Sequence, residues 1–115
     1  MKCSVRELIG ENAITLEDGQ RIYDMIYPEL KAGHVVEIDF TGVTVFASPF
    51  FNAGVGQLLK DIEPAKLNDL LKVASLVTTG LNVLKRVIEN SKQYYSDPKH
   101  KEAVDTVVRS QSEDK

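Results

Sequence analysis

The sequence has little of what the common enzyme classes need. It contains two histidines, one cysteine and no tryptophan, and no Cys/His cluster has metal-ligand spacing. No GxGxxG or GxxxxGK[ST] phosphate-binding motif is present. Gly54 and Gly56 form a GxG, but inside an expected helix, and Ser48 lacks the flanking glycines of a nucleophile elbow. We therefore expect no catalytic residue, no metal and no cofactor, and we expect that the protein is not an enzyme.

The single cysteine excludes an internal disulfide. Cys3 fits a reducing compartment and is most simply a small apolar residue of an early strand. No apolar run approaches the roughly 18–20 residues of a membrane span, and the first ten residues lack the apolar core of a signal peptide. We expect a cytoplasmic protein that makes no membrane contact.

Charge argues against nucleic acid as a partner. The net charge is −3, and no cluster of Lys or Arg is longer than two residues, whereas a phosphate backbone is bound by a basic face. The hydrophobic share of 43% and the charged share of 27% are ordinary for a folded protein. A chain of 115 residues predicts one domain.

Four segments have apolar patterns typical of strands. Residues 34–40 carry apolar side chains on both faces, as in a buried central strand. Thr41-Gly42 then predicts a turn. The four expected strands are residues 4–9, 34–40, 43–46 and 71–76.

Helices are expected between these strands. Thr15 stands three residues before Asp18, close to a capping box, so the first long helix should open there. Pro28 should kink or end it near Tyr27, and Gly33 suits its C-terminal cap. A short helix follows Pro64, and a long one runs from residue 78 to about 95. Its expected inner face is Leu81, Leu84, Ile88 and Tyr95.

The helix after the third strand begins at Ser48-Pro49, an N-cap followed by a first-turn proline. Gly54 and Gly56 weaken this helix by about 1 kcal/mol each relative to alanine, a cost tolerated where something packs close to the backbone. Its expected buried stripe is Phe51, Val55, Leu58 and Ile62.

Alternation of strands and helices predicts an α/β domain with parallel strand pairs and right-handed crossovers. We expect a small mixed, largely parallel sheet of about four strands backed by helices. The domain should span residues 1–98, and residues 99–115 should form a polar tail, in part helical.

Several pieces of the chain together resemble a known family. The chain is similar to the STAS-like domain family, whose role is largely unassigned, and to the STAS domains of bacterial anti-sigma factor antagonists. The resemblance extends to about Pro98 and is specific only as a set of pieces. These are LEDGQRIYD (16–24), VVEIDFTGV (35–43), SPFFN (48–52), LNDLLKV (67–73) and LNVLKRVIENSKQYY (81–95).

The resemblance implies a regulatory protein-interaction module. Ser48 falls on the serine that the antagonists use as phosphoacceptor, and Asp39 on the acid that ends the preceding strand. Around the serine the chain departs from the antagonist pattern, with Ala47, Pro49 and Phe50 in place of Asp, Ser and Gly. The partner implied is a histidine-kinase-type ATPase that acts as an anti-sigma factor or switch kinase.

We expect one partner-binding patch around this helix start, and some of its residues have a second interpretation. Ser48 is either a helix cap alone or a phospho-switch. Phe50 either packs under a strand or forms an exposed docking point. Two other functions stay open: a small-ligand sensor built near Gly54 and Gly56, and a self-associating scaffold. The predicted patch is Asp39, Ser48, Pro49, Phe50, Asn52 and Gln57.

Overall fold

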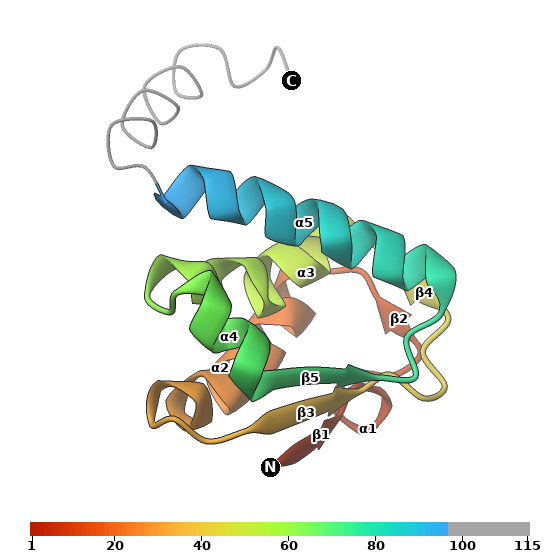
Figure 1. Ribbon diagram of the computed structural model, residues 1–115. Coiled ribbons are helices and arrows are strands. Elements are labelled where there is room, and N and C mark those ends of the chain that lie inside the picture. The colour runs from red at the N-terminus through yellow and green to blue at the C-terminus, as the bar shows by residue number, and fades with distance from the viewer. Residues whose placement is uncertain (97–115) are drawn as a thin grey trace, which may run out of the picture.

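The computed structural model describes residues 1–96 (Figure 1). The expected domain boundary at Pro98 and the expected polar tail at residues 99–115 lie outside this part of the chain. The elements are β1 Lys2–Ser4, α1 Val5–Ile9, β2 Asn12–Ala13, α2 Leu16–Lys31, β3 Val36–Asp39, β4 Val45–Phe46, α3 Ser48–Gly54, the 3₁₀ helix η1 Gly56–Lys60, α4 Pro64–Leu70, β5 Leu71–Ala74 and α5 Thr78–Ser96.

All strand pairs in residues 1–96 are parallel, so the expected α/β class with a small parallel sheet and helices is confirmed. The strands divide between a three-stranded sheet, in the order β1-β3-β5, and a two-stranded sheet of β2 and β4. A turn causes this division. Val43 N–H donates to the Phe40 carbonyl at 2.9 Å, and Gly42 between them has φ +83°. The chain therefore leaves the first sheet before β4 begins.

Among residues 1–96, helices cover only one face of the three-stranded sheet, and the prediction that β3 is apolar on both faces is wrong. Val36 and Ile38 are buried, whereas Glu37 and Asp39 are only half-buried. Strand register places Lys2, Glu37 and Lys72 side by side on the other face. This row of alternating charge has little apolar surface to bury, which explains why none of the helices described in the structure packs on it. Figure 1 shows α3 and α5 together on one side of this sheet.

The segment 4–9, expected as a strand, is a strand for its first residue only, and residues 5–9 form α1. Ser4 Oγ accepts a hydrogen bond from Glu7 N–H at 3.4 Å and so caps this helix. Gly10, with φ +92°, ends it. The pairing of β1 with β3 ends at Ser4 and Asp39. The next residue, Phe40, donates its N–H to the Ala74 carbonyl of β5.

The expected start of α2 is confirmed. Thr15 Oγ1 accepts a hydrogen bond from Asp18 N–H at 3.1 Å, as an N-cap does. The side chains of Ile22, Ile26 and Leu30 recur every four residues and are buried against the sheet side of the molecule.

The end of α2 differs in part from the prediction. The helix continues through Pro28 to Lys31, because the burial of Leu30 beyond the proline offsets the lost hydrogen bond. Gly33 follows with φ +89°, as expected of a C-terminal cap. Its N–H donates to Leu30, and His34 N–H donates to Glu29, the pair of bonds of a Schellman motif.

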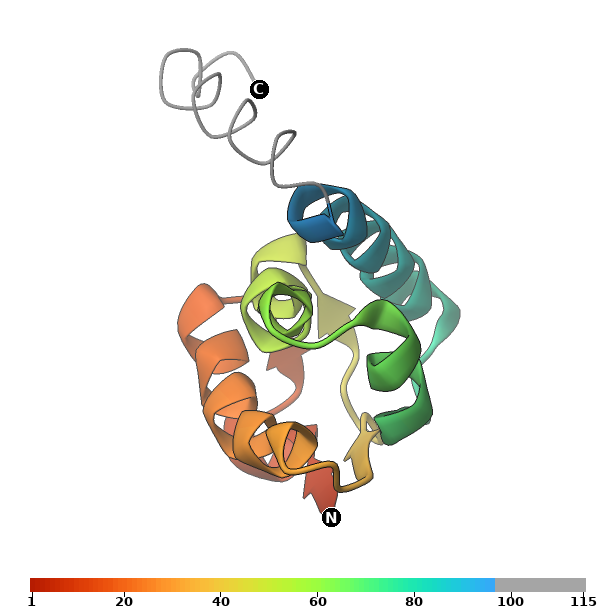
Figure 2. The same ribbon diagram turned by 60° about the vertical axis from the view of Figure 1, so that its left-hand side comes forward.

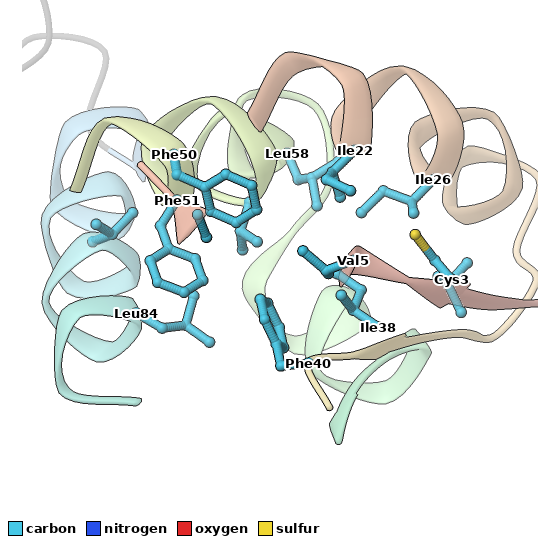
Figure 3. Close-up of a cluster of buried hydrophobic side chains, with 14 of the residues drawn as sticks. Cys3, Val5, Ile22, Ile26, Ile38, Phe40, Phe50, Phe51, Leu58 and Leu84 are labelled. Carbon is cyan, nitrogen blue, oxygen red and sulfur yellow. The ribbon is translucent and has the colours of Figure 1, made fainter. Parts of the chain in front are cut away.

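An aromatic cluster forms the middle of the core (Figure 3). The ring centroid of Phe51 lies 5.3 Å from that of Phe50, 5.8 Å from that of Phe40 and 6.0 Å from that of Phe46. Burial of one such side chain contributes about 2–3 kcal/mol to folding. The cluster therefore ties α3 to β3 and β4.

The expected helix 48–62 is divided. The first part, α3, ends at Gly54, and Val55 interrupts it with φ −122° before η1 begins. The predicted stripe is nevertheless buried at all four positions, which are Phe51, Val55, Leu58 and Ile62.

In the last third of the chain, α4 and α5 occur where they were expected, while the strand expected at residues 71–76 ends at Ala74. Along α5, Leu84 is buried, while Ile88 and Tyr95 pack partly against the core. Leu81 is 37% exposed, so the prediction that it lies on the inner face is wrong. Val87 is buried, although the predicted inner face did not include it. Gly80 lies against the Phe46 ring, and this contact fixes which side of α5 turns inward.

Candidate functional site

The position of α3 is set by a close backbone contact with α2. A Cβ on Gly19 of α2 would overlap the carbonyl oxygen of Phe50, and one on Gly54 would lie 3.3 Å from the carbonyl oxygen of Gly19. On the other side, a Cβ on Gly56 would lie 2.7 Å from Ser91 Oγ of α5. Figure 2 shows α3 and η1 between α2 and α5. The bare backbone of Gly54 and Gly56, considered above as a ligand surface, is thus covered by the domain's own helices.

The first residue of α3 is Ser48, so the prediction that Ser48 is its N-cap is wrong. Ala47 holds the N-cap position, with φ −142°, and provides no side-chain hydrogen bond. The pairing of β2 with β4 explains the shift, because Ala47 N–H donates to the Ala13 carbonyl at 3.0 Å and keeps Ala47 extended. Pro49 becomes the second helical residue, where its missing N–H costs nothing.

Three of the predicted residues form what we call the α3-start patch: Ser48, Pro49 and Asn52. Ser48 is half-buried, and the other two are exposed. Within residues 1–96 the Ser48 hydroxyl has no hydrogen-bond partner. The first turn of α3 carries no acidic residue. The patch thus offers an accessible hydroxyl and an amide, and the close contact of α3 with α2 fixes the position of its backbone.

Phe50 does not belong to this patch. Its side chain is 1% exposed and meets the Phe51 ring edge-on, so it packs inside and cannot be a surface anchor. The contact of its backbone with Gly19 turns the ring into the core.

Gln57 is half-buried and engaged inside the domain. Its Nε2 donates to Gln20 Oε1 at 2.9 Å and to the Ala53 carbonyl at 2.6 Å, while Gln20 Nε2 donates to Asp24 Oδ1 at 2.9 Å. Sequence reasoning missed this link between α2 and η1. Gln57 also lines, with Asn52, an open hollow of about 400 Å³ that α5 borders on its other side. Gln57 borders the α3-start patch, but its Nε2 is already bonded inside the domain and so offers little to a further hydrogen bond.

Asp39 lies apart from these residues, at the end of β3. Its Oδ1 accepts hydrogen bonds from Thr41 N–H at 3.0 Å and Thr41 Oγ1 at 2.6 Å, and its Oδ2 lies 3.8 Å from Lys2 Nζ. These two bonds, and next the Lys2 charge, hold the pKa of Asp39 below its ordinary value. The carboxylate therefore orders the turn after β3.

The hollow beside Asp39 is a second polar site, separate from the α3-start patch. It is open, has a volume of about 840 Å³ and includes Ser4, Arg6 and Glu11. Arg6 and Glu11 pair there at 3.4 Å. No group of three or more His, Cys, Asp or Glu within residues 1–96 is arranged to hold a metal ion.

The parallel three-stranded sheet, its open polar face and the short helix after β4 define a small α/β domain with an accessible serine at a helix start. The chain belongs to the STAS-like domain family of unknown function (DUF4325), which matches residues 18–81. The resemblance to the STAS-like family is thereby confirmed over these residues. Neither the search of curated proteins nor that of solved structures gave a match. Among residues 1–96, no helix is both long and apolar enough to cross a membrane.

Proposed function

We propose that this STAS-like domain is a non-catalytic regulatory module that binds another protein through the α3-start patch. The observation that carries the proposal is the state of Ser48. It is accessible at the first position of α3, yet it neither caps the helix nor bonds to another group of residues 1–96. A serine without a structural task, on a rigidly placed helix start, suits recognition by a partner.

The partner we propose, by analogy with the antagonists, is a histidine-kinase-type ATPase that acts as an anti-sigma factor or switch kinase. In the phosphorylated form, the Ser48 oxygen would take the γ-phosphoryl group of ATP, with loss of its proton and release of ADP. The charge at the patch would then change by about −1.5 to −2. No acidic residue of the first turn opposes that charge, and the helix N-terminus favours it.

A small-ligand sensor has less support than a docking surface. Gly54 and Gly56, which could have admitted a ligand, contact Gly19 and Ser91 of the same domain. Self-association stays the other alternative, and a change of mass with protein concentration would reveal it.

The proposal can be tested by capturing the tagged full chain from its own host at normal expression and identifying the co-purifying proteins. We expect an ATPase of the histidine-kinase type with the wild-type chain. Asn52→Arg should reduce its recovery at least tenfold, because a bulky cation would replace the exposed amide of the patch. Asn82→Arg is the matched control, since Asn82 is also an exposed helical asparagine but belongs to α5.

The intact mass of the captured chain distinguishes the two forms of the proposal. An added phosphate that is present in wild type and absent from Ser48→Ala supports the switch. Recovery of the ATPase with a chain that carries no added phosphate supports a docking module without a phospho-switch. Equal recovery with Asn52→Arg and wild type would contradict the proposed surface.

A further inference from the structure

An apolar groove of about 570 Å³ lies beside β5, and its lining differs from the polar residues of the α3-start patch. Helices α4 and α5 form its walls, and Val55 and Leu59 belong to its lining. Figures 1 and 2 show β5 at one edge of the sheet, with α4 leading directly into it. None of Ser48, Pro49 and Asn52 lines this groove. Leu71, Val73 and Lys92 also line it.

The main chain of β5 has unused hydrogen-bonding groups along this groove. The N–H of Phe40, directly after β3, donates to the Ala74 carbonyl at 2.9 Å, so the main-chain N–H and C=O of Ala74 point toward β3. Main-chain groups alternate in direction along a strand, and Val73 therefore points away from β3. Leu71, two residues earlier, agrees with this alternation, because its N–H donates to Leu67 of α4 and not to β3. No strand of residues 1–96 lies on the outer side of β5, which leaves Val73 N–H and C=O unpaired in the sheet.

The side chains of β5 also turn into the groove. Leu71 and Val73 are in register with the buried Val36 and Ile38, so they belong to the same, helix-covered face. Val73 is nevertheless 39% exposed. A strand added along β5 would place every second side chain on this face, between α4 and α5, and would cover Val73.

Charge indicates which segment would fit. Lys92 is the charged residue of the groove lining, and within residues 1–96 it forms no ion pair. This unpaired ammonium group of α5, beside the edge strand, favours an acidic neighbour.

We propose that this groove binds an extended peptide segment of a partner protein, which adds to β5 as a further strand. The segment carries apolar side chains at alternate positions and at least one Asp or Glu beside them. The surface is distinct from the α3-start patch, so the module has two contact sites. The inference goes beyond the proposed function and does not depend on Ser48.

The test begins with a phage library of random linear twelve-residue peptides, selected on the immobilised full chain. The expected peptides alternate apolar and polar residues and contain Asp or Glu. The most enriched peptide is then synthesised with a fluorophore, and its Kd is measured by anisotropy for each variant. Val73→Pro removes the outward N–H, a change that an edge strand tolerates, and should weaken binding at least tenfold. Val73→Thr is the matched control that keeps the N–H, and its Kd should stay within twofold.

Two further measurements keep the test decisive if Val73→Pro folds poorly. Hydrogen exchange of the wild-type Val73 amide should slow at least tenfold when the peptide is bound, because that N–H enters the new ladder. Lys92→Glu should weaken binding about threefold or more. The proposal is overturned if no peptide is enriched, if the enriched peptides have helical spacing, if the Val73 amide exchanges equally fast with and without peptide, or if Val73→Pro binds as well as Val73→Thr.

Discussion

The carbonyl oxygen of Phe50 lies directly against the Cα of Gly19, leaving no room for a side chain there. This contact joins α3 to α2 at the backbone level. It turns the Phe50 ring into the core and leaves Ser48, Pro49 and Asn52 at the surface. A single glycine in one helix thus decides which residues of another helix lie at the surface.

Gly19→Ala should therefore destabilise the domain by about 3 kcal/mol, because the new methyl group meets backbone that cannot rotate away. Gly54→Ala is the matched comparison on the facing helix. Its methyl group would lie 3.3 Å from the Gly19 oxygen, and the better helix propensity of alanine offsets part of the strain. We expect a change below about 1 kcal/mol for Gly54→Ala. Urea unfolding of both variants checks the difference, and equal stabilities would refute the close contact.

Ser48→Ala should change the free energy of unfolding by less than about 0.5 kcal/mol, since Ser48 does not cap α3. Thr15→Ala removes an observed cap of α2 and should cost about 1 kcal/mol. The pair can be compared by thermal unfolding in the same buffer. A loss of 1 kcal/mol or more for Ser48→Ala would show that the hydroxyl has a structural task after all.

Ser75→Gly should stabilise the domain. Ser75, which follows β5, has φ +59°, a backbone conformation that costs a non-glycine residue about 1–2 kcal/mol. Glycine avoids this strain but loses more entropy on folding, so we expect a net gain of about 0.5–1 kcal/mol. Ser75→Ala keeps the strain and serves as control. If both variants unfold at the same urea concentration, the strained turn is absent in solution.

Asp39 should make the stability of the domain sensitive to acid. Its pKa is lowered in the folded state from an ordinary value of 3.8, so its contribution is present above pH 3.8 and is lost as the pH falls through the folded pKa. Asp39→Asn keeps an acceptor for the Thr41 bonds but has no charge to lose. Wild type should exceed the variant in urea midpoint at pH 6, and the gap should shrink toward pH 2.5. A gap independent of pH would contradict the assignment.

Much of the fold could be predicted from local sequence signals. Thr15 with Asp18, Gly33 and Pro64 each mark a helix end by their own chemistry, and the structure places helix ends there. Alternation of strands with helices likewise indicated parallel pairing. Such signals act within a few residues of each other, so a single sequence displays them.

Features that depend on contacts between distant residues could not be predicted in this way. Residues 5–9 alternate like a strand, but β3 offers a partner only as far as Ser4, so α1 forms instead. Helix α2 passes Pro28 because Leu30 is buried by other elements. The burial of Phe50 could not be predicted for the same kind of reason, since its contact partner Gly19 lies about thirty positions away in the chain.

The central claim is that a protein partner covers the start of α3. Hydrogen exchange of the full chain, alone and with the ATPase captured from its host, tests it most directly. The account predicts that the amides of Ser48, Phe50, Phe51 and Asn52 exchange more slowly in the complex, while the amide of Asn82 on α5 is unchanged. Unaltered exchange at Ser48 and Asn52 in a complex that has formed would contradict it.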